Sequence, residues 1–158
     1  MKRLAVAVAV AALAAMAFSL PLLAADPLPW PWKAKTPPDP ALIQLTRVDD
    51  LAVAIDKSDP PIVSITVKAT APTAGYSELQ LTYRLGDPND LKFEFDARGR
   101  APQEASAQVL TPVTIEVAYS DAPIAKLKVI EVYAKENCMG YSVQDGKATE
   151  CAPKPPAE

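Results

Sequence analysis

The chain has no histidine among its 158 residues, and only two cysteines. Ser-His-Asp and Cys-His catalytic arrangements need an imidazole as the general base, and zinc sites are built mostly from imidazole and thiolate ligands. No Cys-x-x-Cys motif is present either. These absences exclude the commonest hydrolases and imidazole-based metal sites, and we expect a protein that is not an enzyme and that binds no cofactor and no metal.

Carboxylates are the remaining candidates for chemistry, and they cluster at Asp56-Lys57-Ser58-Asp59 and Asp87-Pro88-Asn89-Asp90. A calcium site needs about six to eight converging oxygen ligands, and a glycosidase needs two acids that face each other across a cleft. Both clusters lie between expected strands and consist of residues that turns prefer. We therefore interpret them as turns, and a carboxylate-dependent hydrolase is left as an alternative.

Long apolar runs are absent except at the N-terminus. Lys2 and Arg3 precede an apolar run from Leu4 to Leu20, and the small residues Ala24 and Ala25 stand before Asp26. This order is typical of a secretory signal peptide, here residues 1–25, and it predicts a periplasmic or secreted protein. The alternative is an uncleaved transmembrane anchor, which Pro21 disfavours. No second apolar run follows, so we expect no membrane contact after cleavage.

Positive charge is also scarce. Removing 25 of the 158 residues leaves 133, enough for one domain, and the loss of Lys2 and Arg3 changes the net charge from −3 to −5. A mildly acidic surface has no electrostatic attraction for nucleic acid or for an anionic membrane. We expect neither as a partner.

Proline is abundant at both ends of the mature chain. Six of the 15 residues in 26–40 (DPLPWPWKAKTPPDP) are proline, which removes backbone donors and favours an extended, polyproline-like arm. Both tryptophans, Trp30 and Trp32, belong to this arm and would pack on the domain itself or on a partner. The last residues, 152–158, are expected to be a disordered tail.

Between these ends, apolar and polar residues alternate with a period of two, which is typical of half-buried strands. The pattern is clear in residues 61–69, 79–85, 91–97 and 112–119, weaker in 41–48 and 51–57, and out of phase in 125–136, where a bulge or a doubly buried strand would explain it. No helix is expected outside the signal peptide. About seven to nine short strands, each with one apolar face, predict an all-β, immunoglobulin-like antiparallel sandwich of two sheets over 41–151. A small barrel is the alternative.

The two cysteines, Cys138 and Cys151, flank a hairpin signal. Asp145-Gly146 is a favoured hairpin turn, and the exported compartment permits disulfides. We expect a disulfide at the base of a C-terminal hairpin; a redox pair or a metal site is the alternative.

The segment Pro72 to Tyr76 joins two of the expected strands. Gly75 can adopt the positive φ of a tight connection, which would make this segment a turn that starts a strand. The alternative is an exposed recognition loop carrying Thr73, Gly75 and Tyr76.

Two resemblances bear on this loop. The succession TAGYSELQL, LKFEFDARGRAP and VLTPVTIEV, between about Thr70 and Pro112, resembles a group of uncharacterised exported proteins of Gram-negative bacteria. Those proteins have a Gly-Trp-Ser strand start, an Asp-Phe-Asp-Phe strand and a later Thr-Pro. Here Tyr76 replaces the tryptophan, and Glu94 stands within the aromatic strand. The resemblance implies a periplasmic β-domain and no particular activity.

The shorter match, PTAGYS, is similar to the Asn-Pro-Thr-Thr-Gly-Tyr loop of chagasin-type inhibitors of cysteine peptidases, which are also immunoglobulin-like. Ala71 stands in place of the asparagine. The family's Gly-x-Gly-Gly and Arg-Pro-aromatic loops have only distant counterparts in RGRAP (98–102) and YSDAP (119–123). The resemblance implies a peptidase inhibitor.

Taken with the composition, these patterns predict an exported, non-enzymatic binding or structural module of the periplasm. Its partner would be a protein or another component of the cell envelope. Chagasin-like inhibition of cysteine peptidases is the main alternative.

Overall fold

The computed structural model describes residues 26–31, 39–84, 92–104 and 107–154. The expected signal peptide (1–25), Trp32, the acidic cluster at 87–90 and the last four residues lie outside this part of the chain. None of the described residues belongs to a helix long and apolar enough to cross a membrane.

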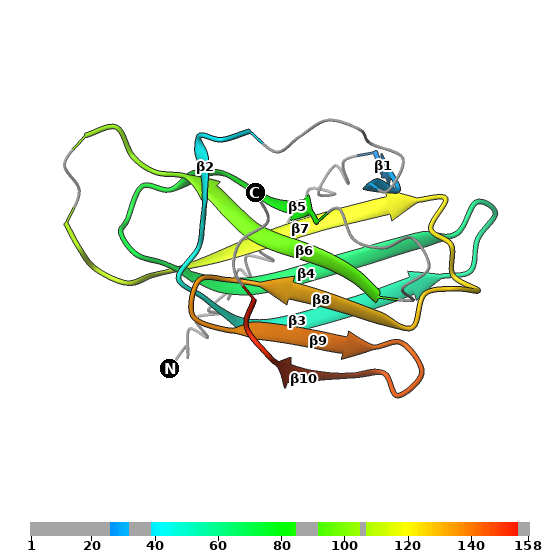
Figure 1. Ribbon diagram of the computed structural model, residues 1–158. Coiled ribbons are helices and arrows are strands. Elements are labelled where there is room, and N and C mark those ends of the chain that lie inside the picture. Colours follow the sequence, from blue (N-terminus) through cyan, green and yellow to red (C-terminus); the bar gives the residue numbers. More distant parts are fainter. Residues whose placement is uncertain (1–25, 32–38, 85–91, 105–106, 155–158) are drawn as a thin grey trace, which may run out of the picture.

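Two β-sheets pack face to face (Figure 1). The first sheet has the order β1 (Leu28–Pro29), β7 (Thr111–Ser120), β4 (Ile62–Ala71) and β3 (Arg47–Asp56). The second has the order β10 (Lys147–Cys151), β9 (Cys138–Ser142), β8 (Val129–Tyr133), β6 (Lys92–Arg100) and β2 (Leu42–Gln44), and β5 (Ser77–Tyr83) also pairs with β6. The predicted all-β sandwich of two sheets is confirmed.

Most strand pairs are antiparallel, but β8 runs parallel to β6. After β6 the chain passes to the first sheet, where it forms β7, and then returns to the second sheet as β8. The chain reverses its direction at each of these two connections, so β8 runs parallel to β6. β1 is also parallel, to the end of β7.

The first strands divide at a different place from the one expected. The sequence predicts strands over 41–48 and 51–57, separated at Asp49-Asp50. Instead, β2 ends at Gln44, and β3 runs without interruption from Arg47 to Asp56. Leu45 is fully buried where the chain passes from one sheet to the other, and a register shift between Val48 and Asp50 accommodates the acidic pair within β3. Burial of Leu45 thus decides the boundary, rather than the charges.

The core lies between the sheets and follows the alternation in the sequence. On β4, Val63, Ile65, Val67 and Ala69 are almost wholly buried, and they face Phe93, Phe95 and Ala97 of β6 in the same cluster. The out-of-phase segment 125–136 contains β8, where Ile130 and Val132 face the core while Glu131 and Tyr133 are buried as well. This strand is therefore doubly buried, one of the two explanations that the sequence allowed.

Trp30 of the Pro-rich arm completes this core. Its side chain is fully buried, and its ring meets Phe93, Tyr119 and Phe95 edge to face, with centroids at 5.0, 5.4 and 6.4 Å. Leu28 and Pro29 pair with Tyr119 and Ser120, and the backbone N–H of Trp30 donates to the Ser120 carbonyl at 3.1 Å. The described part of the arm therefore packs on its own domain.

Candidate functional site

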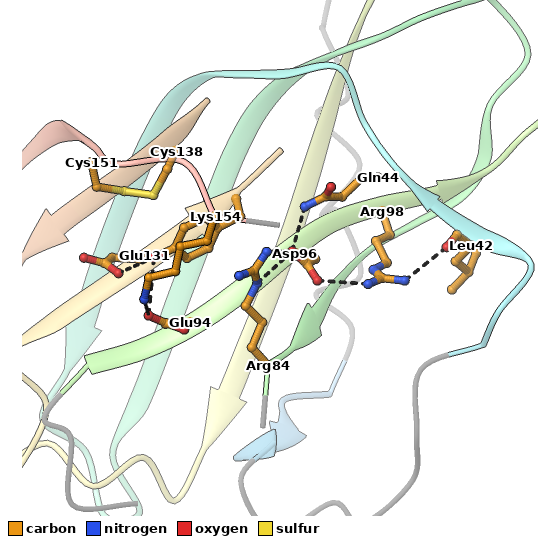
Figure 2. A network of polar contacts seen from close by, with 11 residues as sticks. Leu42, Gln44, Arg84, Glu94, Asp96, Arg98, Glu131, Cys138, Cys151 and Lys154 are labelled. Atoms are coloured by element: carbon orange, nitrogen blue, oxygen red, sulfur yellow. Dashed lines mark hydrogen bonds and ion pairs between the residues drawn. A yellow bond between two sulfur atoms is a disulfide. The ribbon is translucent and has the colours of Figure 1, made fainter. Parts of the chain in front are cut away.

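A buried polar network lies on the outer face of the second sheet (Figure 2). Asp96 of β6 is only 1% exposed. Its Oδ1 accepts hydrogen bonds from Arg84 Nε at 2.9 Å and Gln44 Nε2 at 2.8 Å, and its Oδ2 accepts one from Arg98 Nη2 at 3.0 Å. Arg98 Nη1 also donates to the Leu42 carbonyl at 3.3 Å. Breaking a buried ion pair by removing one partner typically costs about 3–5 kcal/mol, so this network ties β2, β5 and β6 together.

The network continues through Tyr133 of β8. The Arg84 guanidinium lies 4.0 Å from the centre of the Tyr133 ring, and the Tyr133 hydroxyl donates to Glu131 Oε2 at 2.6 Å. Burial raises the pKa of Tyr133 far above its usual range, and the Glu131 hydrogen bond raises it further. The protonated phenol and the paired charges around it link β8 to β6.

The Cys138–Cys151 disulfide is present, as predicted. The two residues face each other in the register of β9 and β10, with Cα atoms 5.0 Å apart. The turn between these strands spans residues 143–146, longer than the two-residue turn that Asp145-Gly146 suggested, and Gly146 has a φ of 64°.

Residues 152–154, which we call the C-terminal segment, follow the disulfide and cross the outer face of the second sheet (Figure 2). Lys154 Nζ lies 2.5 Å from Glu94 Oε1 and 5.6 Å from the centre of the Tyr133 ring. Lys154, expected to belong to a disordered tail, instead contacts Glu94 and the Tyr133 ring of the second sheet.

A groove of about 800 Å³ opens beside this segment. It is bounded by residues from β2, from four connections between strands and from the C-terminal segment: Ile43, Gln44, Thr46, Pro72, Leu110, Lys135, Glu136, Pro153 and Lys154. Ile43 is 45% exposed and Leu110 is 64% exposed, and Val109 next to it is 60% exposed. The groove thus has both apolar and polar lining residues, and Gln44 links it to the buried network.

The groove lies at one end of the sandwich, which we call the loop end. The described parts of three loops, residues 72–76, 101–104 with 107–110, and 134–137, gather there, at the left of Figure 1. Backbone hydrogen bonds hold the last of these loops: Lys135 N–H donates to the Leu45 carbonyl at 2.9 Å, and Glu136 N–H donates to the Thr46 carbonyl at 3.0 Å. The Asn137 side chain donates to the Val48 carbonyl at 2.7 Å and accepts from its N–H at 2.8 Å. The 134–137 loop is thus fixed against the start of β3.

The candidate recognition loop is part of this end. Gly75 has the positive φ expected of a tight connection, 84°, and a Cβ there would lie 3.4 Å from Pro102 Cβ. Tyr76 is half-buried, and its ring would come within 3.1 Å of a Cβ on Gly99; burial raises its pKa. Thr73 is half-buried too, whereas Gly75 is exposed. The aromatic residue of the loop therefore packs inward, as in a turn that starts a strand.

The two distant counterparts of the other chagasin-type loops lie in different places. Arg98 and Arg100 of RGRAP are engaged with Asp96 and with Glu78 and Asp39, respectively. The YSDAP segment follows β7 at the opposite end of the sandwich, since Ser120 pairs with Ile62 at the start of β4. The structure does not bring this second segment near the 72–76 loop.

The groove residues were not identified from the sequence. Ile43 belongs to a short strand that the alternation does not separate from its neighbour, and Lys135 and Lys154 resemble ordinary surface lysines. One signal was available: Val109 and Leu110 form an apolar pair outside any alternating strand.

The described acidic cluster shows turn chemistry, as expected. Asp56 Oδ1 accepts the Ser58 N–H at 3.1 Å. No group of three or more His, Cys, Asp or Glu side chains in the described ranges could hold a metal ion.

Comparisons with protein-family models, curated proteins and solved structures found no match for this chain. The functional inference therefore depends on the groove, the loop and the network.

Proposed function

We propose that this protein is an exported, non-enzymatic binding module that recognises a protein or another cell-envelope component through the groove at its loop end. The main observation behind this proposal is the distribution of exposed apolar side chains. Within the described residues, four large apolar side chains are exposed, and three of them, Ile43, Val109 and Leu110, lie in or next to the groove. Exposed apolar residues that gather at one place mark interaction sites more often than scattered ones do.

The hydrogen bonds that hold two of the groove residues support this role. Gln44 is held by Asp96 at 2.8 Å, and Lys135 is held through its backbone by Leu45 at 2.9 Å. A surface that is already in place loses little conformational entropy when a partner binds. The buried network is thus the support of the binding surface.

Export is part of the proposal and is tested separately. If residues 1–25 are a cleaved signal, the intact mass of protein from the periplasmic fraction begins at Asp26 or within a residue or two of it. Recovery of the full-length chain from the membrane would show an uncleaved anchor. The disulfide is compatible with an oxidising compartment.

Binding is tested by photo-crosslinking in the native host. A photoreactive p-benzoylphenylalanine at Leu110 is expected to form one discrete adduct in the cell envelope. The same residue at Ala54, which is exposed on β3, serves as the matched control and is expected to form none. Absence of an adduct from Leu110, or equal adducts from both positions, would favour a structural role instead.

Chagasin-like inhibition is the second candidate, and one observation favours it: the Pro72 to Tyr76 loop borders the groove through Pro72, with Gly75 exposed at its tip. The mature protein is titrated into a papain-type peptidase assay. Submicromolar inhibition that is lost in Thr73→Ala, with an unchanged melting temperature, would establish this candidate in place of the first.

A further inference from the structure

The disulfide and the groove are closely linked in the chain. Four of the nine residues that line the groove lie within three positions of a disulfide cysteine. Lys135 and Glu136 precede Cys138, and Pro153 and Lys154 follow Cys151. The disulfide thus joins two chain segments that contribute separate parts of the same groove.

The two segments differ in how else they are held. The 134–137 loop has backbone hydrogen bonds to Leu45 and Thr46 and the paired hydrogen bonds between Asn137 and Val48. The C-terminal segment has the contacts of Lys154 with Glu94, whose side chains are 49% and 16% exposed, and with the Tyr133 ring. Partly exposed ion pairs of this kind hold a chain weakly. The segment begins at Cys151, the last residue that β10 pairs with β9, and the disulfide fixes this terminal pair.

We propose that the Cys138–Cys151 disulfide builds the recognition groove, and that its redox state controls binding there. This inference rests on the proposed binding function. A dithiol reductant transfers two electrons and two protons to the disulfide: the S–S bond breaks, two thiols form, and the reductant closes to its own disulfide. Cys151, which is half-buried, is the more accessible of the two sulfur positions, because Cys138 is fully buried. Reduction releases the C-terminal segment from the sheet and removes Pro153 and Lys154 from the groove.

A purely stabilising disulfide predicts something different. In that case its loss lowers the stability of the hairpin, but the groove keeps its shape in the folded protein. The two roles are separated by measuring the groove and the core in the same sample.

The first measurement uses the mature, unmodified chain, by NMR, before and after reduction with dithiothreitol. We expect the methyl resonances of Ile43 and Leu110 to shift and the amides of residues 152–154 to become flexible on the nanosecond timescale. The core methyls of Val63 and Ile65 should stay in place. If only Cys138, Cys151 and their immediate neighbours shift, or if the core signals collapse, the proposal is overturned.

The second measurement repeats the crosslinking from Leu110 in three backgrounds: the native sequence, Cys138→Ala/Cys151→Ala, and Glu94→Gln as the matched control. We expect the adduct to be lost in the cysteine variant and kept in Glu94→Gln, which removes the ion pair with Lys154 but leaves the disulfide and the residues that line the groove. Equal loss in both variants would show that the ion pair, and not the disulfide, holds the groove. An adduct retained in the cysteine variant would refute redox control and leave the binding function intact. No adduct in any background would refute the binding function, and redox control with it.

Discussion

Replacing Trp30 by alanine tests whether the N-terminal arm is part of the folded domain. The side chain is fully buried against Phe93, Phe95 and Tyr119, and replacing a buried tryptophan by alanine costs about 3–5 kcal/mol. One effect offsets this cost: Trp30 Nε1 is buried without a hydrogen-bond partner, and removing this donor also removes its desolvation penalty of about 1 kcal/mol or more. The free energy of unfolding should therefore fall by about 2–4 kcal/mol, which for a domain of this size lowers the melting temperature by roughly 10 °C.

The assay is urea unfolding followed by far-UV circular dichroism, because the substitution removes one of the two tryptophans that fluorescence would report. Leu28→Ala is the matched control in the same arm: Leu28 is 54% exposed, and its loss should change stability by less than about 0.5 kcal/mol. A Trp32→Phe variant leaves Trp30 as the sole indole and should show the blue-shifted emission of a buried ring. A loss below about 1 kcal/mol in Trp30→Ala, with red-shifted emission in Trp32→Phe, would show that the arm does not occupy the core in solution.

Three further changes test other parts of the structure. Replacing both Cys138 and Cys151 by serine should lower stability by up to about 3 kcal/mol, since the bridge closes a short loop, without loss of the sandwich by circular dichroism; free thiols in the native oxidised protein would contradict the bridge itself. Gly75→Val should cost about 1–3 kcal/mol in urea unfolding, because it forces a β-branched residue into positive φ; a neutral result would mean that the loop adapts. The Arg100 hydrogen bond holds the pKa of Glu78 below its usual value, so this pair stabilises the protein above the unfolded pKa of Glu78 and loses its effect as the pH falls through the folded pKa. Melting temperatures between about pH 5 and 3 should therefore fall less in Arg100→Gln than in the native protein, and parallel curves would contradict that linkage.

Much of the architecture could be predicted from the sequence because it depends on local pattern. The alternation in residues 61–69 and 91–97 identified β4, β6 and their core faces, and the compartment together with the cysteine spacing identified the disulfide. These features need only a period of two and a short loop, both of which are visible in consecutive residues. The absence of histidine is also visible in the sequence itself, so composition alone limits the catalytic arrangements that this chain can form.

Only the tertiary structure shows which distant residues contact one another. A run of prolines predicted an extended arm, but only the fold shows that Trp30 lies between the two sheets, against the rings of Phe93 and Tyr119, which are at least 60 positions away. The alternation in 91–97 predicted a half-buried strand, yet Asp96 on its polar face is buried, where Gln44, Arg84 and Arg98 converge on it. The groove arises in the same way, from Ile43, Leu110 and Lys154. Contacts between distant segments leave no periodic trace in the sequence, since their geometry depends on how the sheets pack, and for this protein such contacts bring together the segments that line the proposed binding surface.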